Sequence, residues 1–205
     1  MYRPAAFEMD DHSARALIAE HPLAQLVVAT PTGLQATPVP LIVRGDTLVG
    51  HFARPNELWQ HPGPALAIFT GVDGYVSPNW YPSKHEHGKA VPTWNYETVH
   101  VRGTLVVHDD HDWKLAVLAQ LTDWFERTSE HPWRLDDAPT DYIEAMIRGV
   151  VGIELTDLRI EAKSKLSQNR AEADRQGVIA GLSASTTNHA VADRMLDALM
   201  PDSGT

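Results

Sequence analysis

Residues 24–52, with the sequence AQLVVATPTGLQATPVPLIVRGDTLVGHF, alternate apolar, β-branched runs with turn-forming residues. The tripeptides PTG and RGD punctuate this stretch and leave three runs of strand length, at 24–30, 35–43 and 47–52. The second run contains two prolines, which cannot donate to a central ladder, so we expect it at a sheet edge or at a bulge. The stretch therefore predicts successive β-strands joined by short turns.

Three further runs outside this stretch favour strands: ALAIFT at 65–70, ETVHVRGTLVVH at 97–108 and VVGIEL at 150–155. Helical patterns do not alternate regularly with the strands, which disfavours a doubly wound parallel sheet. Six or more short strands with a few helices predict a mainly β fold with peripheral helices (α+β), arranged as a small barrel.

Helix signals occur at several places along the chain. The expected helices are 11–20, 112–128, one that begins at Asp141, and 190–199, with a single helical turn at 55–59. Asp10 or Asp11 is suited to cap the first helix, and Glu144 follows Asp141 as in a capping box. The second helix repeats tryptophan, valine and leucine at helical spacing, which predicts a helix with one apolar face.

The composition is that of a folded chain without disulfides. The 205 residues carry 17 basic and 27 acidic side chains, a net charge of −10, and 43% hydrophobic residues. The absence of cysteine excludes disulfides, zinc–thiolate sites and cysteine nucleophiles, and it fits a reducing, cytoplasmic location. No apolar run approaches the roughly 20 residues of a membrane helix, and the start lacks the apolar core of a signal peptide. The acidic balance argues against a nucleic-acid binder that uses its whole surface.

The first segment rich in potential ligand-binding side chains is GHFARPNELW at 50–59. His51, Arg54 and Asn56 follow one another at the end of an expected strand. A guanidinium and an amide just past a strand can hold a phosphate, because arginine offers a bidentate fork. The alternative is a surface turn with a solvated arginine.

The second segment, residues 71–96, shows no periodicity and is expected to be a long loop. Five aromatic residues, Trp80 and Trp94 among them, are too many for a solvated tail. Together with Lys84 and Asn95 they suit a planar ligand. The aromatic rings can stack on the ligand, the amide can orient it, and the lysine can neutralise a negative charge on it. The alternative is an aromatic cover over one end of the barrel.

The third segment, KSKLSQNR at 163–170, is polar and basic. Residues 159–175 carry five basic and three acidic side chains, a net charge of +2. This patch is weak for DNA and adequate for one phosphate group.

Metal sites and standard catalytic motifs are disfavoured. The His85-Glu86-His87 triplet and the 108–111 segment HDDH contain metal-ligating residue types, but solvated turns and an aspartate helix cap explain them better. We therefore predict no metal site. The sequence also contains no phosphate-binding loop, nucleophile elbow or zinc-protease motif.

Five blocks together resemble the PaiB family, whose members are described as FMN-binding negative transcriptional regulators. The blocks are MYRPAAF, GHFARPN, FTGVDGYVSPNWYPSK, VPTWNYETVHVRG, and EAKSKLSQNR with a following Asp174-Arg175. The resemblance covers residues 1 to about 182 and implies a six-stranded Greek-key FMN-binding split barrel. It also implies a homodimer that holds flavin at the subunit interface. On this basis residues 1–182 form the barrel domain with its peripheral helices, and 183–205 form a C-terminal helix or tail.

The resemblance also assigns candidate residues. By similarity to related split-barrel flavoproteins, the flavin phosphate is expected near GHFARPN, and strand 36–41 is expected to run beneath the flavin. The phosphate-side candidates are His51, Ala53, Arg54 and Asn56. The candidates for the ring side and the facing subunit are Trp80, Lys84, Trp94, Asn95 and Tyr96. Lys165, Ser167, Gln168 and Arg170 are further motif residues to which the resemblance assigns no partner.

Three functions stay open at this level: a flavin-binding regulator without turnover, an FMN-dependent oxidoreductase such as a flavin reductase, and a haem-binding split barrel. The cofactor expected from the resemblance is FMN, which supplies redox chemistry that the protein only tunes. Neither an obligate acid–base pair nor a helix-turn-helix signature is visible, and the chain is acidic. These features disfavour direct, sequence-specific reading of DNA.

Overall fold

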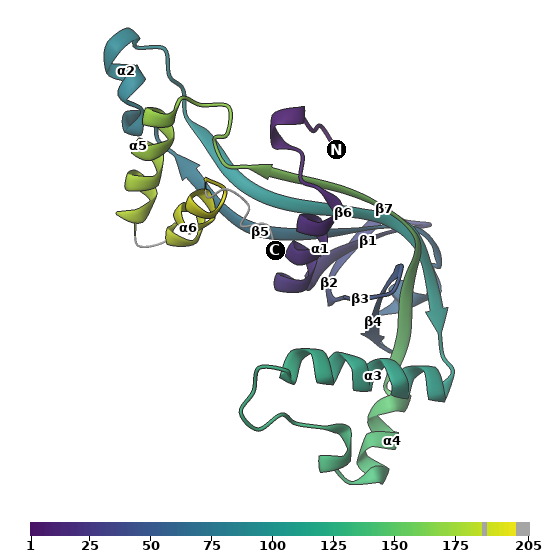
Figure 1. Ribbon diagram of the computed structural model, residues 1–205. Helices are drawn as coiled ribbons and strands as arrows, with labels where there is room; N and C mark the ends of the chain where they lie inside the picture. The colour runs from purple at the N-terminus through teal and green to yellow at the C-terminus, as the bar shows by residue number, and fades with distance from the viewer. Residues whose placement is uncertain (186–187, 200–205) are drawn as a thin grey trace. The chain divides into compact units, whose positions relative to one another are not determined.

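The computed structural model describes residues 1–185 and 188–199, and Figure 1 shows the course of the chain. The strands of the described residues are β1 (Leu23–Thr30), β2 (Gly33–Pro40), β3 (Ile42–Arg44), β4 (Thr47–Ala53), β5 (Gly63–Val76), β6 (Thr93–His108) and β7 (Val150–Lys165). The helices are α1 (Asp11–Glu20), α2 (Pro82–His87), α3 (His111–Glu126), α4 (Thr140–Arg148), α5 (Glu172–Ser183) and α6 (His189–Asp197). Short 3₁₀ turns are η1 (Ala5–Phe7), η2 (Glu57–Gln60), η3 (Pro78–Trp80) and η4 (Leu135–Asp137).

The strands form one sheet in the order β2-β1-β5-β6-β7-β4-β3. β1 pairs antiparallel with β2 and β5, and β4 pairs antiparallel with β3 and β7.

The mainly β architecture with peripheral helices is confirmed. The described part of the chain has seven strands rather than six, and the sheet is open at β2 and β3. The expected strand 35–43 is divided at Leu41, and its two prolines lie in the edge strand β2, as their missing donors require.

The expectation of a long loop at 71–96 is wrong. Residues 71–76 continue β5, residues 93–96 begin β6, and η3 and α2 lie between them. Likewise β7 continues to Lys165, well past the expected end at Leu155. These extensions contain charged residues and glycine instead of a clean apolar alternation, so their strand character depends on pairing with neighbours rather than on local pattern.

The described chain divides into two compact units, each built from separate stretches. Unit 1 comprises residues 1–14, 70–99 and the residues from 162 onward, and unit 2 comprises residues 15–69 and 100–161. Each boundary falls inside a helix or strand, namely α1, β5, β6 and β7. The expected domain boundary between 182 and 183 falls within α5, and residues 186–187 and 200–205 of the expected tail lie outside the described residues.

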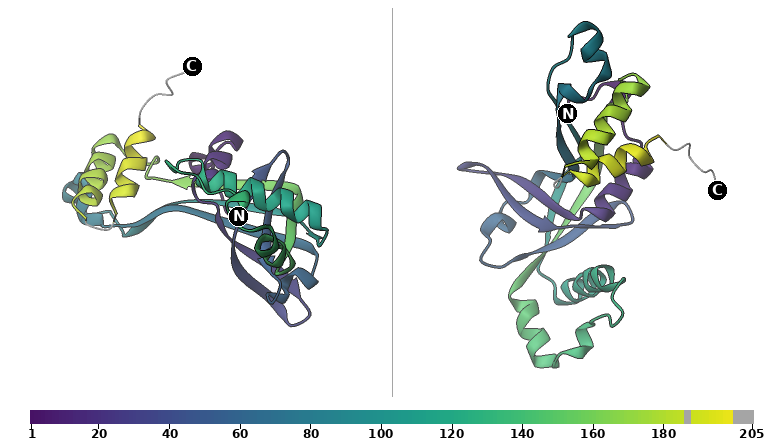
Figure 2. Two further views of the ribbon diagram at one scale, coloured as in Figure 1. Left: turned by 90° about the horizontal axis from the view of Figure 1, so that it is seen from below. Right: turned by 90° about the vertical axis from the view of Figure 1, so that its left-hand side faces the viewer.

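Unit 1 has a core between its strand ends and the helices α5 and α6, which lie side by side in both views of Figure 2. Its buried residues are Val76, Tyr81, Leu166, Val178, Ile179, Leu182, Val191, Ala192 and Met195. α5 was not expected from the sequence, because Gly177 and Gly181 argue against a helix. A Cβ on Gly177 would lie 2.0 Å from the carbonyl oxygen of Trp80, and one on Gly181 would lie 2.2 Å from the Trp80 ring. The glycines therefore allow α5 to lie against η3.

Unit 2 packs α3 onto the sheet through Ile42, Val49, Val117 and Leu121. This confirms the apolar face that the 112–128 pattern predicts. Asp110 caps α3 by accepting a hydrogen bond from the backbone nitrogen of Trp113 at 2.9 Å.

The starts of α1 and α4 differ in how well the sequence predicts them. Asp10 caps α1, since its carboxylate accepts from the Ser13 nitrogen at 2.8 Å. The capping box expected at Asp141 is wrong: α4 begins after Pro139, and no side chain caps it. Glu144 instead faces His111, with 3.0 Å between carboxylate oxygen and Nε2. Within residues 1–185 and 188–199, no helix combines the length and apolar character needed to cross a membrane.

Candidate functional site

Arg54, a phosphate-side candidate, is held by the protein itself in unit 2. Its two terminal nitrogens donate to the Asp109 carboxylate at 2.6 and 3.1 Å, and its Nε donates to the Arg148 carbonyl at 2.9 Å. Lys114 also donates to Asp109, at 2.8 Å. Hydrogen bonds from Arg54 and Lys114 lower the pKa of Asp109 to about 2. Arg54 therefore already has a carboxylate partner, and a phosphate would have to share its donors.

The other phosphate-side candidates have different surroundings. Asn56 accepts from the Leu58 nitrogen at 3.3 Å and donates to the Thr37 hydroxyl at 3.2 Å, so it caps η2. His51 lies on β4, and its Nδ1 is buried with no hydrogen-bond partner among the described residues. Burial lowers the pKa of His51, which favours the neutral imidazole. Ala53, at the end of β4, is exposed.

Four of the five ring-side candidates, all in unit 1, are at least partly exposed: Trp80, Lys84, Trp94 and Tyr96. The Trp94 side chain is 48% exposed, and its indole nitrogen donates to Asp73 at 2.8 Å. Trp80 lies against the glycine face of α5. Lys84 donates to the amide oxygen of Asn79. Tyr96 faces two lysines, with Lys163 Nζ 5.2 Å from its ring centre. Trp94 therefore has a face that a ligand can reach, whereas Trp80 is largely covered.

The structure brings together candidates that the sequence placed in separate groups. Asn95 on β6 is completely buried, and its amide donates to Ser167 Oγ at 3.0 Å, just past the end of β7. Gln168 holds this turn by accepting from the Leu166 nitrogen and donating to the Ser164 carbonyl, each at 2.7 Å. Ser167 has a φ of 67°, in the left-handed region that side chains rarely occupy.

A cavity of about 60 Å³ adjoins this pair within unit 1. Its lining residues are Tyr81, Thr93, Asn95, Lys165, Ser167, Asn169 and Arg170. Among these, Tyr81, Thr93 and Asn169 are absent from the sequence-based candidate set. Tyr81 and Thr93 lie in the aromatic segment and Asn169 in the KSKLSQNR segment, but no spacing rule indicates that these segments line one cavity.

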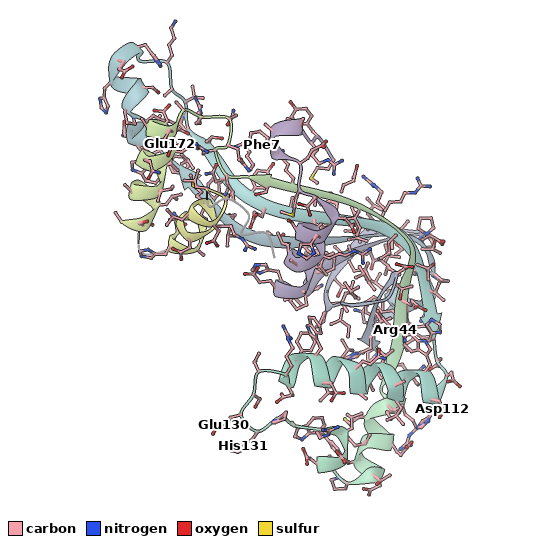
Figure 3. All side chains as sticks on the ribbon, viewed as in Figure 1. Phe7, Arg44, Asp112, Glu130, His131 and Glu172 are labelled. Atoms are coloured by element: carbon pink, nitrogen blue, oxygen red, sulfur yellow. The ribbon has the colours of Figure 1, made fainter. Side chains whose placement is uncertain are left out.

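The cavity carries positive charge. Lys165 donates from Nζ to the Thr93 hydroxyl at 2.6 Å and to the Trp94 carbonyl. Burial, and then the neighbouring charges of Lys163 and Arg170, lower the pKa of Lys165. The Arg170 guanidinium lies 4.8 Å from the centre of the Tyr81 ring. Lys163, buried nearby, donates to the Tyr2 carbonyl at 3.2 Å and lies 6.0 Å from the Phe7 ring, labelled in Figure 3.

The histidine-rich segments take part in ion pairs and turns. His108 pairs with Glu154 at 2.9 Å, and the same carboxylate meets Arg44, labelled in Figure 3, also at 2.9 Å. Hydrogen bonds to Asp112 and Glu144 raise the pKa of His111. His87 accepts from the Lys89 nitrogen at 3.1 Å. Among the described residues no three potential ligands gather around a point that could hold a metal.

Comparison with known proteins gives one family and several relatives. The sequence model of a family described as "Putative FMN-binding domain" matches residues 1–157. Protease synthase and sporulation protein PAI 2 of Bacillus subtilis is 31% identical over 137 residues, which is 64% of this chain and 62% of that protein. Uncharacterized protein AN0679 of Emericella nidulans is 34% identical over 147 residues, 66% of this chain and 59% of that protein. The chain thus spans less than two thirds of these relatives' lengths.

Solved structures show the same fold at low sequence identity. The FAD and heme binding protein of Mycobacterium smegmatis is 20% identical, with a TM-score of 0.59, over 82% of this chain and 78% of that one. The flavocytochrome Anf3 of Azotobacter vinelandii is 15% identical, with a TM-score of 0.58, over 78% of this chain and 69% of that one. The architecture described above is therefore that of split-barrel proteins.

Proposed function

Since the chain belongs to the PaiB family of FMN-binding domains, we propose that it is an FMN-binding regulatory protein that works as a cytoplasmic homodimer. The observation that carries the proposal is the family match, which covers residues 1–157 and so includes nearly all of the sheet. Bound FMN would supply redox chemistry, and the residues of this chain would bind and orient it.

His51 and Arg54 fit a flavin phosphate in different ways. The Nδ1 of His51 is a buried polar atom without a partner among the described residues, which is the state expected of a group that a ligand completes. Arg54 offers a guanidinium at the end of the same strand, already oriented by Asp109. We propose that the phosphate side of the site uses His51 and Arg54, with Asn56 shaping the turn that follows.

A regulatory rather than enzymatic role rests on the relatives. The Bacillus subtilis relative is named for protease synthesis and sporulation, which are regulated processes. The net charge of −10 makes a broad DNA-binding surface unfavourable. We therefore propose that regulation passes through a partner protein or through a bound metabolite. The absence of cysteine supports a cytoplasmic location.

The first experiment is an absorbance spectrum of the purified protein before and after addition of FMN. The proposal expects flavin bands and no Soret band. It also expects no steady consumption of reduced nicotinamide when FMN is present. A Soret band would favour the haem-binding alternative, and sustained nicotinamide oxidation would make the protein an FMN-dependent oxidoreductase.

The second experiment measures the affinities for FMN and riboflavin in the wild-type protein and in Arg54→Ala. Loss of a charge-assisted hydrogen bond is expected to weaken FMN about tenfold or more, because such bonds contribute about 1.5–3 kcal/mol. Riboflavin has no phosphate and should be affected little. Equal losses for both ligands would make Arg54 a purely structural partner of Asp109.

A further inference from the structure

We propose that the cavity of unit 1 between β6 and the turn after β7 is a binding site for a small oxyanion, either inorganic phosphate or the phosphate group of a metabolite. Nothing in the proposed flavin-binding role requires such a site. Four observations carry it: unpaired cations, a buried hydroxyl without a partner, a preformed amide–hydroxyl pair, and the size of the cavity.

The cations of the cavity have no carboxylate partner. Among the described residues no aspartate or glutamate forms an ion pair with Lys165 or Arg170. The charge of Asp174 interacts with that of Arg170, but the two Asp174 oxygens accept from Ser83, at 3.0 Å from the nitrogen and 2.7 Å from the hydroxyl. Lys165 is partly buried and repelled by Lys163 and Arg170, and a bound anion would offset both the burial and the repulsion.

Tyr81 supplies a buried hydroxyl beside Arg170 and Ser167, and no hydrogen bond of normal length and direction from the described residues reaches it. Its side chain is 1% exposed. Arg170 lies over the same ring, so a ligand that meets the hydroxyl is within reach of the guanidinium. Buried hydroxyls are rarely left unpaired, and a cavity-lining hydroxyl in this state points to a ligand that accepts a hydrogen bond from it.

The rest of the lining is already fixed in place. Asn95 and Ser167 hold one another, and Gln168 locks the turn through two backbone contacts. Thr93 and Lys165 are hydrogen-bonded to each other at 2.6 Å. Donors whose positions are set before the ligand arrives lose little side-chain entropy on binding.

The size of the cavity selects the class of ligand. A single water needs roughly 10–15 Å³, so a cavity of about 60 Å³ has room for a tetrahedral oxyanion. Pockets for drug-sized ligands have about 300–1,000 Å³, so the flavin ring system does not fit here. The fork of Arg170 and the ammonium of Lys165 are the groups that bind phosphate oxygens in proteins.

The test is a calorimetric titration of inorganic phosphate into the flavin-free protein, with chloride as the reference salt. Wild type is expected to bind one phosphate per chain. Arg170→Gln and Lys165→Gln should each weaken binding about tenfold or more, and Tyr81→Phe should weaken it severalfold while keeping the ring beneath Arg170. Arg159→Gln removes the same charge at an exposed position of β7 and should leave the affinity unchanged.

The outcomes decide the proposal in both directions. No measurable phosphate binding by wild type would overturn it, and so would equal losses in Arg170→Gln and Arg159→Gln, since these would indicate a diffuse charge effect. Melting temperatures of all variants are measured alongside. If Arg170→Gln fails to fold, Tyr81→Phe and the conservative Arg170→Lys carry the comparison, and unchanged affinity in both also overturns the site.

A second arm identifies the source of the phosphate. If Arg170→Gln loses the preference for FMN over riboflavin, the oxyanion is the flavin phosphate. If FMN affinity is unchanged and inorganic phosphate still binds to the FMN-loaded protein, the oxyanion belongs to a separate ligand. Either result supports an oxyanion site. A protein that binds phosphate but no flavin would contradict the proposed function and would still support the oxyanion site.

Discussion

Asp109 is the residue on which the geometry around Arg54 depends. Its carboxylate receives hydrogen bonds from Arg54 and from Lys114, whose side chain is only 6% exposed. The carboxylate itself is about half exposed, so water screens part of the attraction. Most of the stability that Asp109 contributes therefore comes from its contact with Lys114. If Asp109 were removed, the ammonium of Lys114 would be left buried without a counter-charge.

We expect Asp109→Asn to lower the free energy of unfolding by about 1–2 kcal/mol at neutral pH, because Lys114 loses its carboxylate partner. The folded-state pKa of Asp109 is lowered to about 2 from an ordinary value of 3.8. Its contribution is therefore fully present above about pH 4 and is lost as the pH falls toward 2. Urea unfolding of both proteins at several pH values measures this, and the difference between them should shrink in that window. A difference independent of pH would show that charge is not its source.

Trp94 allows a test of the ring side of the proposed flavin site. Its side chain is 48% exposed, so a ligand can reach it. If its indole contacts the flavin, electron transfer from the indole quenches the excited flavin. Trp94→Leu should then raise the fluorescence of bound FMN and weaken binding by about 1 kcal/mol, with little change in melting temperature.

Trp133→Leu serves as the control for Trp94→Leu, since Trp133 is similarly exposed, at 41%, and is not among the candidate flavin-site residues. It should leave the quantum yield of bound FMN unchanged. Equal yields in the wild-type protein and Trp94→Leu would remove Trp94 from the ring-side candidates.

The sequence predicts those helices and strands whose position is determined by residues close together in the chain. The edge position of β2 follows from its prolines, and the length and apolar face of α3 follow from its spacing. The ends of β5 and β7 and the whole of α5 could not be predicted, because contacts distant in sequence determine them. The same holds for the candidate site: Asn95 and Ser167 are individually visible, but their pairing joins residues 72 positions apart.

The glycine face of α5 gives a prediction about packing. Gly177→Ala should gain helix propensity by about 1 kcal/mol, yet its Cβ would lie 2.0 Å from the Trp80 carbonyl oxygen. We expect a net destabilisation of about 1–3 kcal/mol, because backbone must shift to relieve the contact. Chemical denaturation measures it, with Ser183→Ala at the exposed end of the same helix as control. A stabilised Gly177→Ala protein would show that α5 does not lie this close to η3.

At the scale of the whole molecule, a homodimer is the expected assembly. Apolar side chains that a monomer leaves exposed in unit 1 include Tyr75 at 43%, Val91 at 67% and Trp94 at 48%. Exposed apolar residues of this size favour an interface when they gather on one surface. Light scattering at micromolar concentration should return twice the mass of one chain. A monomer that binds FMN at full strength would contradict the proposal that the flavin site needs two subunits.

The division of the chain into two units has a consequence for inheritance. Since the polypeptide passes between the units inside α1, β5, β6 and β7, neither unit is encoded by one continuous stretch of gene. A recombination event that exchanged one unit for a homologue's would need four crossovers, each inside a helix or in register within a strand. Because unit 1 contains both ends of the chain, a single crossover always leaves it a mixture of both parents, and the two units are therefore expected to diverge together within a lineage.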